Sequence, residues 1–230
     1  MPSIPVLLND RAGGGSENGP NEIRAAFAAR GLDADVHVPR DHEALVRLAS
    51  DHAKNGSPTV VVGGGDGSLH AVAGTLAGTG TTLGILPLGT FNHFAKDLGL
   101  PLALGDAVGV IAAGATRTVD VGEANGRVFV NNASVGVYAS VVRLREGMQQ
   151  RLGRGKWPAF VLAVWRTLTR YELLLVRVRL KEAKAANGDA AGTELVRRTP
   201  FVFIGNNAYA MEALTLGQRE ALDAGLLSLH

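Results

Sequence analysis

The hydrophobic positions in the first half of the chain form short apolar runs that alternate with segments of helical spacing. Apolar runs of four or five residues suit buried strands, whereas apolar residues three and four positions apart suit amphipathic helices. We expect strands at Ile4–Leu8, Ala34–Val38, Thr59–Val62 and Leu83–Leu86. We expect helices at Asn21–Arg30, Asp41–Lys54, Asn92–Leu98 and Ala103–Ala113, and one more that places Leu69, Val72, Ala73 and Leu76 on one face. This alternation is typical of a parallel sheet covered by helices.

Beyond about Thr118 the pattern changes to strands separated by turn residues. Asn125-Gly126 is a two-residue hairpin signal between two short apolar runs. The later elements expected are a helix at Trp157–Leu168 and strands at Leu173–Leu180, Thr199–Gly205 and Leu226–Leu229. The sequence therefore predicts an α/β fold, with an N-terminal parallel-sheet domain at residues 1–117 and a mainly β, sandwich-like second domain at residues 118–230.

Composition narrows the class of protein. The chain has 230 residues, 46% of them hydrophobic, which is ample for a packed core. Cysteine is absent, so disulfides, thiol nucleophiles and thiolate metal sites are excluded, as suits a reducing compartment. No stretch reaches the roughly 18 uncharged apolar residues of a membrane span, and Met1–Asn9 lacks a basic signal-peptide region. We expect a cytoplasmic protein, soluble or peripheral to the inner face of the membrane.

Charge is unevenly distributed along the chain. The formal net charge is +2, yet residues 143–170 contain seven Lys or Arg residues and one acid, Glu146, a local charge of +6. A basic segment on an otherwise acidic chain points to an anionic partner surface rather than to a general nucleic-acid coat.

A run of glycines follows the third predicted strand, in Gly63-Gly64-Gly65-Asp66-Gly67-Ser68. Glycines between a strand and a helix allow a phosphate to approach backbone N–H groups and to lie on the helix N-terminus. Asp66 has the wrong charge to touch phosphate, so its sensible role is to hold Mg²⁺ or a bridging water. In the alternative interpretation, Asp66 and Ser68 only cap the helix and the glycines only make a tight turn.

Two common phosphate-binding motifs are excluded at this turn. The sequence lacks G-x-x-x-x-G-K-[ST], so the turn is not a P-loop. Leu69 stands where a Rossmann turn needs its third small residue. The turn is therefore neither a P-loop nor a Rossmann dinucleotide-binding turn.

Several segments together resemble the diacylglycerol kinase catalytic family in order and spacing. They are Asn9–Gly14, Gly63–Ser68 and Pro87–Ala95, followed by Asn131–Gly136 and Gly205–Tyr209, so the resemblance spans nearly the whole chain. It implies a transferase of phospholipid metabolism that uses ATP, Mg²⁺ and a lipid hydroxyl as phosphate acceptor. By the same resemblance, residues 1–117 form the nucleotide-binding domain and residues 118–230 form an incomplete lipid-substrate domain. The nucleotide-contacting residues that it implies are Asn9, Gly13, Gly64, Gly65, Asp66, Gly67, Ser68, Thr90 and Asn92. Of these, Asp66 would be the most sensitive to substitution.

The sequence departs from the family pattern near its end. Relatives have an Asp-Gly pair in a metal site and a later D-G-E-like segment whose carboxylate acts as base. Here Ala224 stands in the place of that aspartate, which leaves Asp223 as the candidate metal ligand beside Asp66. No D-G-E-like segment occurs, so the catalytic base is not identified. We favour truncation over loss of the reaction, because Leu226–Leu229 would otherwise be an unpaired edge strand.

The predicted helix at Trp157–Leu168 carries an apolar stripe that includes both tryptophans of the chain, Trp157 and Trp165. Arg166 and Arg170 lie together on another face. Such a helix suits the lipid interface, with its cations on anionic headgroups. The alternative is that the stripe packs on the β domain.

Three functions remain open at this point. The first is an ATP-dependent kinase for diacylglycerol or a related lipid alcohol, and the second is an NAD kinase, which shares the G-G-D-G turn and the fold. The third is a nucleotide- or lipid-binding protein without catalysis. No motif identifies the acceptor lipid or the oligomeric state, and no nucleic-acid partner is expected.

Overall fold

The computed structural model describes residues 3–9, 19–136, 173–179, 194–209, 219 and 221–230. The chain divides into two compact units. One consists of Met1–Asn132 with Gly205–Ser228, and the other of Ala133–Ile204 with Leu229–His230. Among the described residues, no helix has the length and apolar character needed to cross a membrane.

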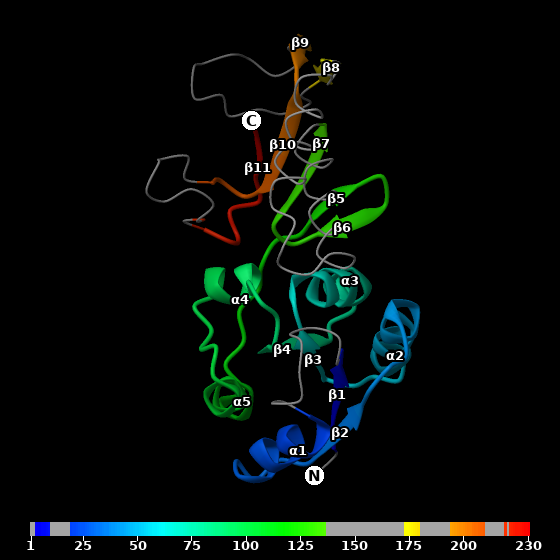
Figure 1. Cartoon of the computed structure of the whole chain (residues 1–230), viewed down its shortest axis with the longest axis vertical. Coiled ribbons are helices and arrows are strands. Elements are labelled where there is room, and N and C mark those ends of the chain that lie inside the picture. The colour runs from blue at the N-terminus through cyan, green and yellow to red at the C-terminus, as the bar shows by residue number, and fades with distance from the viewer. Residues whose placement is uncertain (1–2, 10–18, 137–172, 180–193, 210–218, 220) are drawn as a thin grey trace, which may run out of the picture. The chain divides into compact units, whose positions relative to one another are not determined.

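The first unit is built on a four-stranded parallel sheet with the order β2-β1-β3-β4 (Figure 1). The strands are β1 (Ile4–Leu8), β2 (Ala34–His37), β3 (Thr59–Gly64) and β4 (Thr82–Pro87). The continuous Val60-Val61-Val62 run of β3 is wholly buried, as expected for a central strand with both faces covered. All four predicted strands of this half are confirmed.

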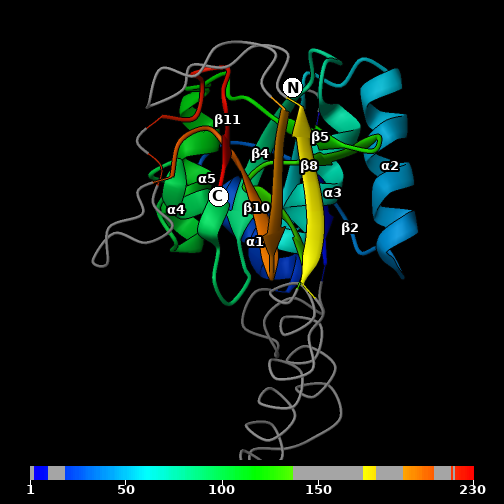
Figure 2. The ribbon, with the colours of Figure 1, turned by 90° about the horizontal axis from the view of Figure 1, so that it is seen from above.

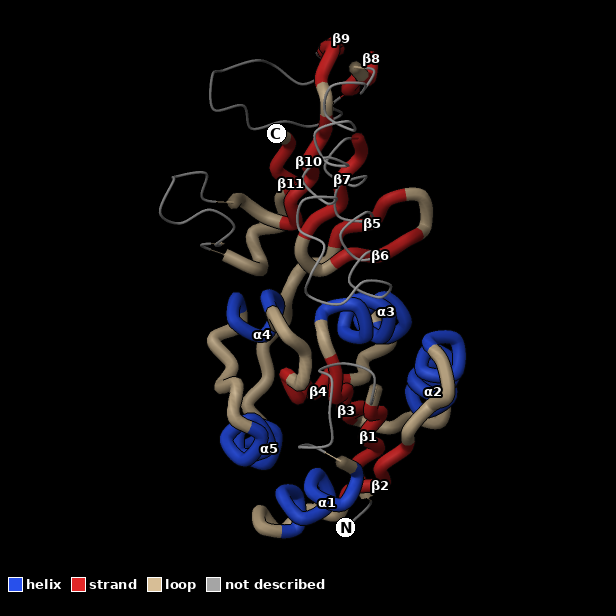
Figure 3. The backbone as a smooth tube through the Cα atoms, viewed as in Figure 1, coloured by secondary structure: helices blue, strands red, loops and turns tan. Residues whose placement is uncertain are grey.

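Five helices connect and cover these strands (Figure 3). They are α1 (Pro20–Ala28), α2 (His42–Lys54), α3 (Asp66–Leu76), α4 (His93–Asp97) and α5 (Leu104–Ala113). Local signals set their ends. The Asp41 carboxylate caps α2 by accepting the N–H of Ala44 at 2.7 Å, and α5 stops at Gly114, which is left-handed.

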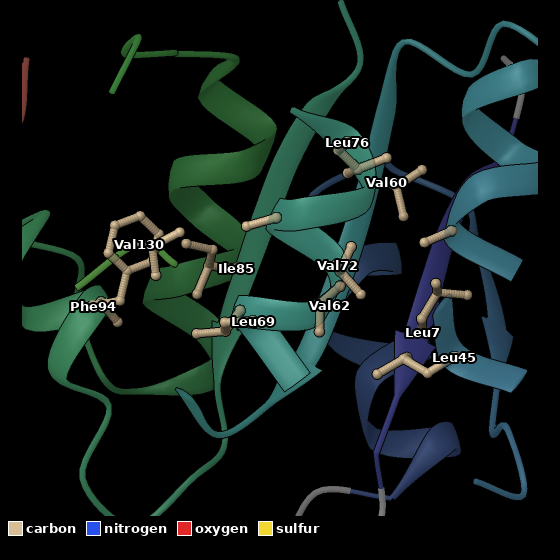
Figure 4. Packing of buried hydrophobic residues seen from close by; sticks show 13 residues of the cluster. Leu7, Leu45, Val60, Val62, Leu69, Val72, Leu76, Ile85, Phe94 and Val130 are labelled. Atoms are coloured by element: carbon tan, nitrogen blue, oxygen red, sulfur yellow. The ribbon is translucent and has the colours of Figure 1, made fainter. Parts of the chain in front are cut away.

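Two hydrophobic clusters lie on opposite faces of the parallel sheet. Leu7, Val62 and Ile85 contribute to the cluster under α2 and α3, which Figure 4 shows. Val6, Val61 and Leu86, one position along each strand, join the second cluster with residues of α1 and α5. In Figure 2, α2 and α5 accordingly lie on opposite sides of the sheet. Each buried aliphatic side chain stabilises the fold by about 1.5–3 kcal/mol, so the strands are fixed from both faces.

Short antiparallel strands follow the helical region. β5 (Gly122–Ala124) and β6 (Arg127–Phe129) form the hairpin predicted at Asn125-Gly126, and both turn residues have positive φ, 52° and 74°. The remaining strands are β7 (Asn132–Gly136), β8 (Leu174–Arg179), β9 (Glu194–Thr199), β10 (Phe201–Asn206) and β11 (Leu227–Leu229). They form a sheet of order β11-β10-β7 and an antiparallel β8–β9 pair. The predicted α/β fold with a later β-rich region is confirmed.

The two compact units differ from the predicted domains at 1–117 and 118–230. The β5–β6 hairpin belongs to the first unit because it packs on α3, where a Cβ at Gly74 would lie 3.2 Å from Val128. The segment Gly205–Ser228 also belongs there, and Arg219 in it binds Asp97 at the end of α4. These contacts join residues distant in sequence, which a change of local pattern cannot reveal.

Candidate nucleotide site at the glycine turns

Two glycine turns meet at the carboxyl edge of the parallel sheet. β3 and β4 end side by side, with Gly64 paired to Pro87, and each strand leads into a helix, α3 or α4. The two turns touch through backbone, because a Cβ added to Gly89 would overlap the Cα of Gly65. Only glycine at position 89 permits this approach. The structure thus brings together the two glycine segments that the sequence singled out.

The end of β1 is tied to the same edge. The backbone N–H of Asn9 donates to the carbonyl of Gly63 at 2.8 Å, and the Asn9 side-chain amide donates to the Ser68 hydroxyl at 2.7 Å. Ser68 is buried and lies so near Gly64 that a Cβ there would be 3.0 Å from its Oγ. Asn9 and Ser68 therefore hold the first turn of α3 against β1. Gly13, the other residue expected from the opening segment, lies outside the described residues.

Asp66 joins the two turns. It stands at the start of α3, and its carboxylate accepts the backbone N–H groups of His93 at 3.2 Å and Phe94 at 3.1 Å, in the first turn of α4. A carboxylate is well placed at a helix N-terminus, where unpaired N–H groups carry partial positive charge. Each oxygen retains acceptor capacity, because an ionised carboxylate has about four lone-pair sites. The capping role foreseen for Asp66 exists, but the capped helix is α4.

Asn92 shapes the second turn from within. Its backbone is left-handed, with φ 51°, and its side chain is buried. The side-chain oxygen accepts the N–H of Gly89 at 2.9 Å, while the amide nitrogen donates to the carbonyls of Pro87 at 3.0 Å and Gly89 at 2.7 Å. These bonds engage the amide within the turn, so the nucleotide contact expected from Asn92 stays a prediction.

The outer positions of the two turns are open. Thr90 is exposed, and Gly67 is exposed with no atom within 4 Å of the place where its Cβ would be. The N-cap of α3 is Gly65, which supplies no side-chain cap. The first N–H groups of this 11-residue helix are therefore not capped by its own N-cap side chain. Phosphate oxygens suit such a position.

The two predicted metal ligands have different surroundings. Asp66 lies at the turns, but the Asp223 carboxylate is paired with Arg117 at 3.3 Å, which already compensates its charge. Within the part of the chain that the structure describes, no group of three or more His, Cys, Asp or Glu side chains could hold a metal ion. The fit to Mg²⁺ thus rests on the remaining acceptor capacity of Asp66, with phosphate and water oxygens to complete the shell. Asp223 as a ligand stays a prediction.

Arg219 is the principal residue that sequence reasoning missed. Its side chain is 0% exposed, and its guanidinium donates to the Asp97 carboxylate at 2.7 and 3.0 Å and to the Asn131 side chain at 3.0 Å. It also lies over the rings of Phe94 and Tyr209, with 5.9 and 5.7 Å to their centroids. A single arginine between polar residues carries no periodic signal, so only the fold reveals it.

The later family-like segments supply buried amides to the same unit. The Asn206 amide nitrogen donates to the carbonyls of Asp120 at 2.7 Å and Val130 at 3.0 Å. Asn207 is left-handed, with φ 68°, and its side-chain oxygen accepts the N–H of Ala224 at 3.1 Å. Through their side chains these asparagines bind backbone groups of other segments, which accounts for polar residues in this buried stretch.

Burial shifts the pKa values of two side chains near Arg219. Desolvation lowers the pKa of His70, although the nearby Asp66 carboxylate acts in the opposite direction. The Nε2 atom of His70 is buried without a hydrogen-bond partner among the described residues. Desolvation likewise raises the pKa of Tyr209. Both shifts favour the neutral form of the side chain.

The predicted lipid-facing helix at Trp157–Leu168, with Trp157, Trp165 and Arg166, lies outside the described residues, so its membrane contact stays a prediction.

Comparisons with known proteins agree with this geometry. The model of the diacylglycerol kinase catalytic domain matches residues 3–124, which contain both glycine turns. A protein of Pseudomonas aeruginosa named "probable lipid kinase YegS-like" is 33% identical over 223 residues, covering 94% of this chain and 68% of the relative. A protein of the same name from Pseudomonas syringae pv. tomato is 30% identical, with the same coverage.

Solved structures show the same fold. A crystal structure described as a diacylglycerol kinase from Bacillus anthracis superposes with a TM-score of 0.69 at 23% identity, covering 99% of this chain and 72% of that chain. A second from that organism gives a TM-score of 0.72 at 24% identity. The chain belongs to the diacylglycerol kinase catalytic domain family.

Proposed function

We propose that this protein is an ATP-dependent lipid kinase, which transfers the γ-phosphate to a hydroxyl of diacylglycerol or a related lipid alcohol. The observation that carries the proposal is the convergence of two glycine turns and the end of β1 at one edge of a parallel sheet. Ligands of open α/β sheets bind outside the carboxyl ends of the strands. The family and the names of the relatives support kinase chemistry on a lipid.

The triphosphate is proposed to lie at the start of α3. Gly65 offers no side chain there and Gly67 is open to solvent, so phosphate oxygens can reach the backbone. The partial positive charge of the helix N-terminus favours the anion. Asn9 and Ser68 fix this turn against β1, which keeps the N–H groups in place before the nucleotide binds.

Asp66 is the residue proposed to hold Mg²⁺, directly or through water. Bound there, the ion would neutralise charge on the phosphates during transfer. The backbone N–H groups of His93 and Phe94 orient the Asp66 carboxylate. The second glycine turn thereby positions the metal-binding side chain that the first turn carries. In the transfer itself, the lipid hydroxyl oxygen bonds to the γ-phosphorus, the bond to the ADP oxygen breaks, and the hydroxyl proton passes to a base. No residue described here is assigned as that base.

The decisive test is transfer of radiolabel from γ-labelled ATP to a panel of lipid alcohols, with Asp66→Asn as the variant. We expect transfer to fall on the order of a hundredfold or more, because positioning and charge neutralisation supply most of the catalysis. Asp106→Asn is the matched control, since Asp106 occupies the first turn of α5 and is exposed. Full transfer by the Asp66 variant would remove the role assigned to it.

The same assay separates the other two functions. Phosphorylated NAD in place of phosphorylated lipid would identify an NAD kinase. Nucleotide binding without any phosphorylated product would identify a binding protein, in which Asp66 serves only to cap α4.

A further inference from the structure

The β8–β9 hairpin is an antiparallel strand pair (Figure 3). Its two faces differ in character. Directly paired residues of antiparallel strands lie on the same face, and successive residues alternate between faces. The register pairs Leu175 with Arg198 and Arg179 with Glu194. One face, which we call the arginine face, therefore consists of Leu175, Arg177, Arg179, Glu194, Val196 and Arg198.

Every residue of the arginine face is exposed. Leu175 is 69% exposed, and Leu173, which precedes the strand at the same alternation, is 56% exposed. The opposite face of β8 is half-buried, and the Leu174 side chain there lies against Gly136, where an added Cβ would be 3.1 Å away. The hairpin thus turns its other face toward its own unit and leaves large aliphatic side chains of the arginine face in water.

The arginine face carries a net positive charge, and ion pairs fix the positions of two of its arginines. Three arginines oppose one glutamate, a net charge of +2. The Glu194 carboxylate binds Arg177 at 2.8 Å and Arg179 at 3.3 Å, so it holds these two guanidiniums side by side without neutralising both. Guanidinium groups match the oxygens of phosphate esters in geometry as well as in charge.

We propose that the arginine face binds the surface of an anionic lipid bilayer. Leu173, Leu175 and Val196 would enter the interface between headgroups and acyl chains, while the arginines meet lipid phosphates. A bilayer interface offers an apolar layer and phosphate together, which a nucleic acid does not. The proposal rests on the proposed function, because a kinase that phosphorylates a membrane lipid must reach the bilayer.

The test is co-sedimentation of the full chain with vesicles of phosphatidylcholine, with and without phosphatidylglycerol, in the absence of nucleotide. The variant is Arg177→Gln/Arg179→Gln/Arg198→Gln. We expect the wild-type chain to bind the anionic vesicles preferentially, and each arginine removed to weaken that binding about fivefold. Leu175→Ser should weaken binding to both vesicle types.

Arg197→Gln is the matched control, because Arg197 is exposed on the same strand but belongs to the opposite face. The proposal is overturned if wild type ignores anionic vesicles, if the triple variant binds as well as wild type, or if the control loses as much binding. Circular dichroism of each variant establishes that the fold is retained.

Failure of this proposal is distinguishable from failure of the proposed function. Vesicle binding needs no catalysis, so a chain without kinase activity still tests the arginine face. Conversely, transfer of phosphate to a short-chain, water-soluble diacylglycerol tests the kinase without a bilayer. The triple variant should retain that transfer while losing transfer to the same lipid in anionic vesicles.

Discussion

The glycine turns of the first unit and the arginine face of the second differ in how their polar groups are used. At the turns, the side chains of Asn9, Asp66 and Asn92 are hydrogen-bonded to neighbouring backbone or side chains. On the arginine face the side chains are exposed, and among the described residues their ion pairs all involve Glu194. If both proposals hold, the difference separates two kinds of binding site: a fixed turn for the nucleotide phosphates, and an exposed surface for the lipid headgroups.

Substitutions in these two regions should also differ in their effect on the free energy of unfolding. A buried, hydrogen-bonded residue contributes to stability and to function together, whereas an exposed one contributes to binding alone. Substitutions at the turns should therefore lower the free energy of unfolding, and substitutions on the arginine face should leave it nearly unchanged. Three predictions test this contrast.

The largest effect is expected at Arg219. Arg219→Met should lower the free energy of unfolding by about 3–5 kcal/mol, because it leaves the Asp97 carboxylate, 14% exposed, without its partner. Arg198→Met makes the same change on the arginine face and should cost no more than about 0.5 kcal/mol. Urea denaturation of both variants measures the difference. Equal losses would show that Arg219 has no special role in the first unit.

A smaller loss is expected where the two turns touch. Gly89→Ala should lower the free energy of unfolding by about 1–3 kcal/mol, since the added methyl meets the Gly65 backbone, which has no rotamer with which to yield. It should also weaken ATP binding, measured by calorimetry. Gly105→Ala in the first turn of α5 is the control, because nothing lies within 4 Å of its Cβ position. Unchanged stability and ATP binding in the Gly89 variant would contradict the close contact.

The smallest effect concerns pH. The folded-state pKa of His70 lies below its ordinary value because of burial, so the unfolded chain takes up this proton first as pH falls. The contribution of neutral His70 to the free energy of unfolding should therefore be present above the ordinary pKa of 6.5 and should be lost as the pH falls below it. His70→Asn should flatten this decline in urea titrations between pH 7 and pH 5. Arg198→Met, which changes no group titrating in that range, should keep the wild-type slope.

The sequence by itself determined the elements and their class. Continuous β-branched runs and 3.6-residue periodicity are local properties, so the strands and helices of residues 1–117 and the Asn125-Gly126 hairpin could be predicted from short windows. The glycine turns were also visible, because a strand, three glycines and an amphipathic helix are adjacent in sequence. The family resemblance added which ligand these turns would take.

Only the tertiary structure decided what the polar side chains do. Asp66 caps a helix that begins 27 residues later, and Arg219 reaches Asp97 across 122 residues. The pairing of the arginine face likewise depends on the register of two strands separated by an intervening segment. Side-chain hydrogen bonds and buried charges depend on distances in space, and the order of residues leaves those distances open until the sheet and its helices have packed.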